Sequence, residues 1–391
     1  MPPSPDPTSS SIAYLDHAAS SPVRPEVVAA MVEVLEHLPA NPSGSHRAAR
    51  QARRRLDDAR DVVADVVGAR PGEVVFTSGG TESDNLAVRG VVAAVGGVAA
   101  CSAVEHHAVL DTVLSTGGFV LGVDGDGRLD LDGLADRSLG DVAQPSLVSV
   151  MLTNNETGVA NDLDRVAEGV ARRWPGAVLH TDAVAAAAWS DLSESARAAD
   201  LVTISAHKLG GPKGTGALVV REGTSLHPVT TGGGQERERR SGTPDVAGAV
   251  GFSVALAAAA AERDSTVLRL RGLRRRLVDG LVARIPDLVV TAGAVADADR
   301  SPATVHLCFP GVDRQSLLFL LDEAGVAASW GSSCASGAPE VSHVLAAMGV
   351  DPDLARGSLR LSLGWNSTDS EVDRAVEVIP AAFDRLSGSV R

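Results

Sequence analysis

Short buried-strand patterns that alternate with helical patterns constrain the fold of this 391-residue chain more than any other feature. Each is a run of apolar, β-forming residues, and a segment with apolar residues at helical spacing follows it. The runs span residues 73–77, 98–104, 147–153, 177–181 and 201–205. Such alternation is typical of right-handed βαβ units. It predicts an α/β fold with a parallel sheet flanked by helices.

Length and composition favour a globular protein with two domains. Hydrophobic residues make up 44% of the chain, and 391 residues can bury a sizeable core. The 35 Lys and Arg residues against 49 Asp and Glu residues give a net charge of −14. This charge disfavours nucleic acid and acidic membranes as partners, and no apolar stretch is long and uninterrupted enough to predict a membrane span. We therefore expect small molecules or proteins as partners.

The cysteine pattern and the N-terminus indicate a cytoplasmic protein without a metal site. Cys101, Cys308 and Cys334 are far apart and odd in number, which predicts neither a disulfide framework nor a CxxC metal site. Residues 1–11 are rich in Pro and Ser and have neither the basic start nor the apolar core of a signal peptide. We expect this tail to be disordered.

One lysine follows a predicted strand and enters a Gly- and Pro-rich turn. The strand over 201–205 stops at Ser205, and Lys208 comes three residues later. Open α/β sheets hold their ligands at the C-terminal ends of strands. A flexible amine there can form a Schiff base with a carbonyl compound, and Ser205 and His207 offer donors for an anion such as phosphate. The alternative is a solvated lysine on a loop, because most lysines are solvated.

The other strand ends carry polar groups of complementary chemistry. Gly80 and Thr81 lie in a Gly-Gly turn between a strand and a helix, where unpaired amides and the positive helix end favour an anion. His106, Asn155 and Asp182 follow the next three strands. Pyridoxal phosphate needs such a set: a phosphate cradle, a ring-stacking group, a donor to the phenolic oxygen, a carboxylate for the ring nitrogen and a lysine. Each residue alone also has an ordinary structural explanation.

The second half of the chain adds a charged loop, helical stretches and a small-residue loop. The charge run in the glycine-rich loop 231–243 predicts a solvated segment. Helical patterns over 246–262 and 265–285 mark the domain boundary. Cys334 lies among Gly and Ser in a loop that we expect to be exposed. Arg360 stands in the middle of a strand pattern, where its planar fork suits a substrate carboxylate better than a core.

Ten segments are specific enough to indicate a family. They read YLDHAAS, NPSGSH, FTSGGTESDNLA, VEHHAVLDT, NNETGV, HTDA, SAHKLGGPKGTGAL, GGGQERERRSGT, GSSCAS and LRLSLG. From Tyr14 to about Leu386 the chain resembles the cysteine desulfurases of the NifS/IscS type, within the class V aminotransferase, fold type I pyridoxal-phosphate family. The resemblance implies a large domain over 23–262 with a mainly parallel seven-stranded sheet. A smaller α+β domain over 12–22 and 263–391 would carry the Cys334 loop.

The resemblance also implies how the cofactor is held. Lys208 would form the Schiff base, Asp182 would pair with the ring nitrogen, and His106 would stack on the ring. The remaining cofactor-binding residues would be Gly80, Thr81, Ser205 and His207 at the phosphate, Asn155 on the phenolic side, and Thr243 at the phosphate of the neighbouring subunit of a homodimer.

Substrate and product follow from the same resemblance. Arg360 and Asn41 would bind the carboxylate of L-cysteine, although residues 41–46 also fit the cap of a helix over 47–67. Cys334 would take the substrate sulfur as a persulfide, leaving L-alanine, and pass it to a sulfur-acceptor protein or small thiol. His106 is the candidate base for the thiol, because a free cysteine is mostly protonated at neutral pH.

Two alternatives remain open from the sequence. A related C–S β-lyase, selenocysteine lyase or epimerase needs Lys208 and Asp182 but no nucleophilic Cys334. Family members usually have Gln three residues after the ring-binding Asp, whereas this chain has Ala185. That departure also allows a degenerate member that serves only as a binding partner. The sequence does not identify the sulfur acceptor.

Overall fold

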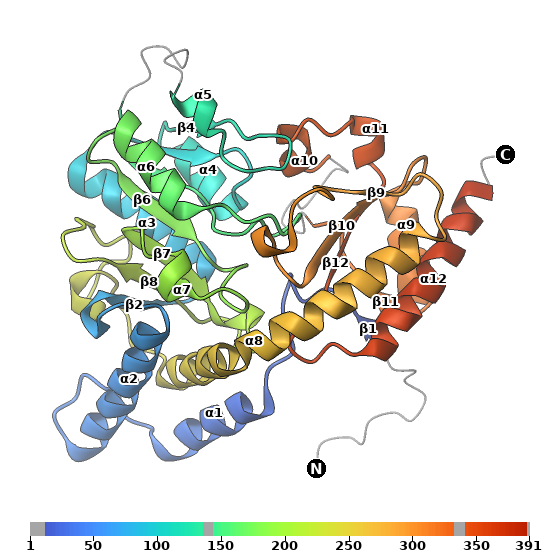
Figure 1. Ribbon diagram of the computed structural model, residues 1–391. Coiled ribbons are helices and arrows are strands. Elements are labelled where there is room, and N and C mark those ends of the chain that lie inside the picture. Colours follow the sequence, from blue (N-terminus) through green and yellow to red (C-terminus); the bar gives the residue numbers. More distant parts are fainter. Residues whose placement is uncertain (1–11, 136–143, 332–340, 389–391) are drawn as a thin grey trace.

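A seven-stranded sheet is the centre of the computed structural model, which describes residues 12–135, 144–331 and 341–388 (Figure 1). Five neighbouring strands, β7, β6, β5, β3 and β4 in spatial order, run parallel to one another. Strand β8 is antiparallel to both of its neighbours, β2 and β7. The predicted α/β class and mainly parallel sheet are confirmed. In spatial order the strands are β2 (Val74–Thr77), β8 (Gly216–Val220), β7 (Leu201–Ser205), β6 (Val178–Asp182), β5 (Pro145–Ser149), β3 (Val98–Ser102) and β4 (Phe119–Leu121).

The sheet is mainly and not wholly parallel, because residues 206–215, which join β7 to β8, are too few for a crossover helix. The structure corrects the strand predictions in one place. The strand expected over 147–153 is Pro145–Ser149 instead. The chain beyond it still bonds to β6, since Leu152 N donates to Asp182 O over 3.0 Å.

Helices cover both faces of the sheet, which explains why the strand patterns are almost continuously apolar. Val74 and Phe76 belong to the core cluster on one face, and Val75 belongs to the cluster on the other. The first face is covered by α1 (Pro25–His37), α2 (Arg47–Val66), α5 (Leu131–Ala135), α6 (Leu163–Arg173), α7 (Leu192–Ser195) and the start of α8; the second is covered by α3 (Gly80–Val95) and α4 (His107–Ser115).

A smaller unit packs beside the sheet and contains the N-terminal strand (Figure 1). Its three-stranded antiparallel sheet has the order β12-β10-β9, and β1 pairs with β11 in parallel. Residues 12–22 therefore join the C-terminal part of the chain through β1. The elements are β1 (Ala13–Tyr14), β9 (Val289–Val290), β10 (Thr304–Cys308), β11 (Val326–Ala327), β12 (Ser358–Ser362), α9 (Arg314–Glu323), α10 (His343–Ala347), α11 (Pro352–Ala355) and α12 (Asp369–Ser387).

Helix α8 (Val246–Val282) links the two units as one continuous helix of 37 residues. It replaces the two helical segments predicted over 246–262 and 265–285, because neither Gly nor Pro interrupts residues 263–271. Its residues up to Ala259 pack in the core of the large sheet, and those from Leu270 pack in the core of the small unit. Among the described residues α8 alone has the length and composition of a membrane span, yet 61% of its most apolar window is buried in the protein.

Four short 3-10 turns complete the described chain. They are η1 (Pro71–Glu73), η3 (Ala206–Lys208), η4 (Glu236–Glu238) and η5 (Asp297–Asp299). The domain boundaries of 23–262 and 263–391 remain a prediction. The expected disordered tail over 1–11 and the Cys334 loop lie outside the described residues.

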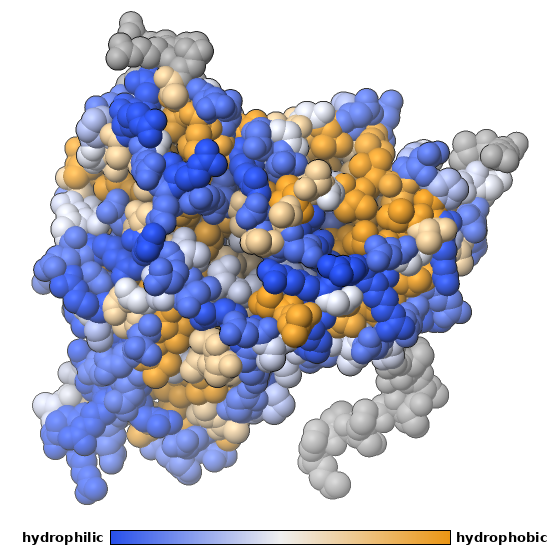
Figure 2. All heavy atoms as spheres, viewed as in Figure 1, coloured by the Kyte–Doolittle hydropathy of each residue, from blue (hydrophilic) through white to orange (hydrophobic). Residues whose placement is uncertain are grey.

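The surface reflects the amphipathic helices that cover the sheet. Figure 2 shows hydrophilic residues over the region of α2 and apolar residues gathered over the region of α9 and β9. Helix α2 buries Ala52, Leu56 and Val63 on one side and exposes most of its arginines on the other, whereas its Arg60 is buried. That pattern is the one expected of a helix packed on a sheet by a single face.

Candidate active site

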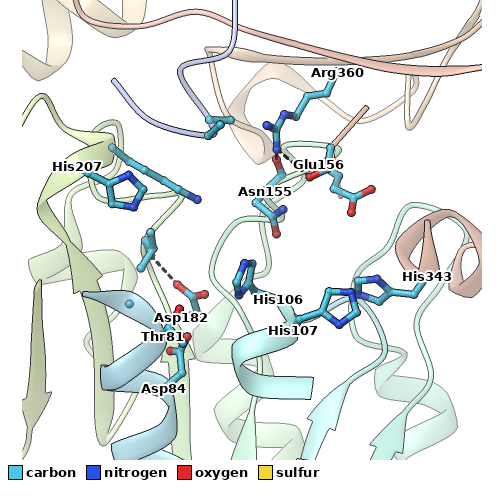
Figure 3. A pocket seen from close by; sticks show the side chains of 16 residues that line it. Thr81, Asp84, His106, His107, Asn155, Glu156, Asp182, His207, His343 and Arg360 are labelled. Carbon is cyan, nitrogen blue, oxygen red and sulfur yellow. Dashed lines mark hydrogen bonds between the residues drawn. The ribbon is translucent and has the colours of Figure 1, made fainter. Parts of the chain in front are cut away.

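A cavity of about 270 Å³ lies where the carboxyl ends of the parallel strands meet the small unit. This is the position at which α/β sheets hold ligands. Figure 3 shows His106, Asn155, Asp182, His207 and Arg360 around the cavity. Of the predicted site residues, those that line it are Gly80, Thr81, His106, Asn155, Asp182, His207, Lys208 and Arg360.

The turn that carries Lys208 is fixed by its own amides and by the N-terminal segment. Ala206 N donates to Thr215 O over 3.1 Å, and Gly211 N donates to Ala206 O over 3.0 Å. Ser21 Oγ donates to the Lys208 carbonyl over 3.1 Å. The turn needs Gly210, whose φ is +84° and whose position a side chain would crowd against Arg24 and Trp365. These contacts hold the backbone of the turn rigid, while the Lys208 side chain that it carries keeps its flexible stem.

The Gly-Gly turn supplies an anion site at the N-terminus of α3. Gly79 has a φ of +147°, and a side chain at Gly80 would come within 3.0 Å of Val184 Cγ2. Glycine at positions 79 and 80 therefore lets the backbone of this turn approach a ligand closely. Helix α3 has 16 residues, so its first amides and its dipole favour a phosphate. Ser205 is buried at the end of β7, 3.8 Å from the position of a Gly79 side chain.

His106 is held as a neutral ring with a defined tautomer. Its Nδ1 accepts the amide of Ala108 over 3.1 Å and caps α4. Burial lowers the pKa of His106, while the nearby Asp182 opposes that shift. Because Nδ1 accepts a hydrogen bond, the single proton of the neutral ring lies on Nε2. His207 is also neutral, since burial first and the charge of Lys208 second lower its pKa to about 4.

Asp182 ends β6 with its side chain in the cavity. Its Oδ1 accepts the amide of Val184 over 2.8 Å, and the residue is 5% exposed. A carboxylate held in this way is oriented by the backbone and partly shielded from water. It can pair with a protonated ring nitrogen of a ligand.

Arg360 is buried yet well partnered. Its Nη2 pairs with Asp16 Oδ1 over 2.9 Å, and its Nη1 donates to the carbonyls of Asn155 and Gly331 over 3.0 and 3.3 Å. Its Nε is buried without a hydrogen-bond partner among the described residues. A charged guanidinium that is 2% exposed and has a donor to spare is suited to a carboxylate ligand.

Two predicted residues, Asn41 and Thr243, lie away from the cavity of this chain. Asn41 is exposed, and its Oδ1 accepts the amide of Ser43 over 2.9 Å. The neighbouring His46 caps α2 by accepting from Ala49 N, which confirms the capping interpretation of the loop. Thr243 is exposed at the end of the glycine-rich loop, and Cys334 lies outside the described residues.

The prediction of a solvated charge run at 231–243 is wrong for Glu236. The side chain of Glu236 is 5% exposed and pairs with both Nη atoms of Arg60 over 2.7 and 2.8 Å. It also accepts the amide of Phe76 over 2.9 Å. The cause is a buried arginine on α2 that no local pattern in the loop reveals.

Sequence reasoning missed four polar residues that line the cavity. Asp84, His107, Glu156 and His343 line it; the first three belong to motifs in which other residues had been assigned, whereas His343 lies outside all ten segments. Glu156 accepts from Ser342 Oγ over 2.6 Å and joins the two units. The rings of His107 and His343 lie 4.6 Å apart between centroids. Only adjacency in the sequence to Asn155 and His106 could have indicated Glu156 and His107.

The donor set fits pyridoxal phosphate. An amine, an oriented carboxylate, a neutral ring and a glycine cradle at a helix N-terminus share one cavity. Each matches one part of the cofactor: aldehyde, ring nitrogen, ring face and phosphate. The fold and the site thus define a pyridoxal-phosphate enzyme of the large-sheet, fold type I class.

Comparison with known proteins agrees with this class. The chain belongs to the class-V aminotransferase family, whose model matches residues 13–375. It is 43% identical over 388 residues to the IscS-like cysteine desulfurase of Mycobacterium tuberculosis, covering 96% of this chain and 97% of that protein. Among solved structures, a NifS-like protein matches with a TM-score of 0.86, 31% identity and coverage of 96% and 100% of the two chains. SspA in complex with cysteine matches with a TM-score of 0.75, 28% identity and coverage of 90% and 98%.

Proposed function

We propose that this chain is a pyridoxal-phosphate-dependent cysteine desulfurase that converts L-cysteine to L-alanine and takes the sulfur as a persulfide on Cys334. The convergence of Lys208, Asp182 and Arg360 on one cavity carries the proposal. Relatives that share nearly the whole chain are named cysteine desulfurases, and one structural relative was solved with cysteine. The proposed substrate follows from those names and from the spare donor of Arg360.

The described residues suggest how the cofactor is bound. Lys208 would hold its aldehyde carbon, Asp182 its ring nitrogen, and His106 its ring face. When bound, pyridoxal phosphate supplies an electron sink for carbanion chemistry at the substrate Cα. The phosphate would be held by Gly80, Thr81, Ser205 and His207, with Asn155 on the phenolic side and Thr243 contributed by a second copy of the chain.

Four residues of this chain then have separate roles in the reaction. Arg360 pairs with the carboxylate of cysteine and fixes its Cα near Lys208, whose Nζ takes the Cα proton. The Cys334 thiolate attacks the substrate sulfur, so that a sulfur–sulfur bond forms as the carbon–sulfur bond breaks. The carbon keeps the bonding electrons and gains protons to become alanine. His106 is the candidate base for the thiol, because its ring is neutral at physiological pH.

Removal of the nucleophile tests this function. In Cys334→Ala we expect cysteine binding and the cofactor colour to survive, while protein persulfide and nearly all alanine production are lost. Products from cysteine are measured with and without an added thiol acceptor, and Ser333→Ala in the same loop serves as the control. A β-lyase would still release sulfide from Cys334→Ala at the parent rate, together with pyruvate and ammonia. Either result would falsify the desulfurase assignment.

The oligomeric state, cellular location and sulfur acceptor of the enzyme are also part of this proposal. We expect a homodimer in the cytoplasm that passes its persulfide sulfur to an acceptor protein or a small thiol. Purified protein loaded with persulfide and offered candidate acceptors would identify the acceptor by the appearance of sulfur on it. If the persulfide sulfur were transferred to none of the acceptors offered, a sulfur-donating role would be contradicted.

A further inference from the structure

The outer face of α2 carries charged residues in an unusual order. Six exposed charged residues recur along the helix at intervals of three or four residues, so they form one ridge opposite the buried Ala52, Leu56 and Val63. The first three residues of this ridge are basic, and the last three are acidic. We call the ridge the charged stripe; its residues are Arg47, Arg50, Arg54, Asp58, Asp61 and Asp65.

The charged stripe lacks partners within the chain, unlike the charges on the flanks of the same helix. Arg53 pairs with Asp57 over 2.9 Å, and Arg55 pairs with Glu33 of α1 over 3.5 Å. None of the six stripe residues forms an ion pair with any residue that the structure describes. Figure 1 shows α2 at the edge of the large unit, on the side away from the small unit. The stripe is therefore open to a partner.

A helix that faces only water favours the opposite order of charges. Acidic side chains stabilise the positive N-terminal end of a helix dipole, and basic side chains stabilise the negative C-terminal end. Helix α2 has no acidic residue in its first turn and no basic residue in its last turn. Within each half of the stripe, like charges also follow one another at three- and four-residue spacing, which destabilises an isolated helix. The order of charges is therefore unfavourable for α2 alone.

A second copy of α2 in antiparallel orientation matches the charges of the stripe. The stripe changes sign between Arg54 and Asp58. In an antiparallel pair centred there, Arg54 lies opposite Asp58 of the partner subunit. Arg47 then lies opposite Asp65 of the partner subunit, and each basic half meets the negative end of the other helix dipole. A parallel copy would place like charges on one another, so the stripe is self-complementary only about a twofold axis.

The surroundings of α2 connect the stripe with the proposed dimer. A groove of about 430 Å³ lies between α2 and the glycine-rich loop, lined by Arg53 and Arg60 on the helix and by Gln235 and Pro244 on the other side. Pro244 directly follows Thr243, which the proposed function assigns to the cavity of a second copy. A partner that lies along α2 is therefore next to the loop that carries Thr243.

We propose that the charged stripe pairs with the same stripe of a second copy of this chain, antiparallel across a twofold axis. The inference deepens the homodimer of the proposed function and rests on it for the presence of that second copy. Exposed charge pairs contribute little to affinity, because water and salt screen them. Their role here is to select orientation and register, since a parallel or shifted arrangement brings like charges together.

Two charge-reversed chains test the pairing. The first carries Arg47→Asp and Arg54→Asp, which makes five of the six stripe residues acidic. The second carries Asp58→Arg and Asp65→Arg, which makes five of the six basic. All four positions are exposed, and the changes at both helix ends suit the helix dipole, so we expect both chains to fold. Thermal melting checks this, and the single reversals Arg47→Asp and Asp65→Arg replace any pair that melts early.

Subunit exchange between the two holoenzymes measures the pairing. Without it the chains mix at random, and half of the dimers contain one chain of each kind. With it the mixed dimer matches all four reversed contacts, whereas each homodimer brings like charges together. We therefore expect mixed dimers to rise to about three quarters or more, about a tenfold change in the exchange equilibrium. Native mass spectrometry measures this fraction, and a value of one half would overturn the proposal while leaving the homodimer intact.

The control mixes the basic-stripe chain with a chain that carries Arg165→Asp and Arg172→Asp, at two exposed residues of α6. This chain has the same net charge as the acidic-stripe chain but keeps the parent stripe. Its mixed dimer has two matched and two mismatched contacts, so we expect a fraction near one half. Equal enrichment in test and control would overturn the proposal, because net charge alone would then explain the mixing.

Salt and sedimentation complete the test. In about 1 M salt the mixed fraction of the test pair should return toward one half, because exposed charges are screened. A fraction that stays high would exclude charge pairing and overturn the proposal. A parent chain that sediments as a monomer would overturn it together with the homodimer. The desulfurase chemistry is judged separately, from the products of Cys334→Ala.

Discussion

At the scale of single residues, Arg360 is the strongest test of substrate binding. Its guanidinium is fixed by Asp16 and by two carbonyls, so its unpartnered Nε–H has a set direction. Arg360→Lys keeps the charge but cannot hold the same fork. We expect the KM for cysteine to rise about tenfold or more, because a charge-assisted hydrogen bond contributes about 1.5–3 kcal/mol.

The control for Arg360→Lys is Arg356→Lys, at an arginine that is 69% exposed and pairs with Asp353. Steady-state kinetics and thermal melting of both variants separate binding from stability. An Arg360→Lys enzyme with the parent KM would show that another group binds the carboxylate.

Ala185 lines a second, small cavity beside the first. This cavity of about 20 Å³ also touches Asn155 and Lys208, and it has room for about one water molecule. We expect Ala185→Gln to fill it and shift the pH titration of the bound cofactor's absorbance, since one hydrogen bond changes by about 0.5–1.5 kcal/mol. Ala185→Ser is the small-volume control. A titration unchanged by Gln would show that the cavity does not affect the cofactor.

At the scale of elements, the buried pair of Arg60 and Glu236 fixes the glycine-rich loop to the sheet. Residues 236, 237 and 238 all have positive φ, between 47° and 64°, which costs about 1–3 kcal/mol each outside glycine. Glu236 offsets this cost by binding Arg60 and the free amide of Phe76 on the edge strand β2. The loop conformation therefore depends on a contact with α2.

Glu236→Gln tests that dependence. We expect the free energy of unfolding to fall by about 3–5 kcal/mol, because Arg60 is left as an unpaired buried charge. Chemical denaturation measures the change. Glu238→Gln, at an exposed residue of the same turn, should change it by less than about 0.5 kcal/mol. Equal effects at both positions would show that the pair does not hold the loop.

The same elements show how far sequence reasoning reaches. Lys208, Asp182 and Gly80 were predictable, because each follows an apolar strand and the carboxyl ends of parallel strands meet. Asp84, His180 and Glu105 were not, because their partners depend on the register of β5, β6 and β7. A polar residue inside an apolar segment does not say which neighbour satisfies it. The prediction that Glu236 is solvated was wrong for a similar reason, since its partner Arg60 lies 176 residues away in the sequence.

At the scale of the whole molecule, the exposure of Thr243 motivates the homodimer. Thr243 is exposed and does not line the cavity of its own chain, whereas Lys208 and Asp182 lie inside it. If a second chain lends Thr243 to the cavity, the active site is built from both. Variants of Lys208 and of Thr243 should then complement each other, because their defects lie on different sides of the shared site.

Subunit exchange between Lys208→Ala and Thr243→Ala tests this arrangement. Random exchange makes half of the dimers mixed, and each mixed dimer has one site with both residues intact, so about a quarter of the parent activity should return. Exchange between Lys208→Ala and Asp182→Asn is the control, because both residues act within one chain and no intact site can form. Sedimentation as a monomer would exclude the dimer. Equal recovery in both mixtures would show that Thr243 is not contributed by the partner, since complementation would then have a cause other than the shared site.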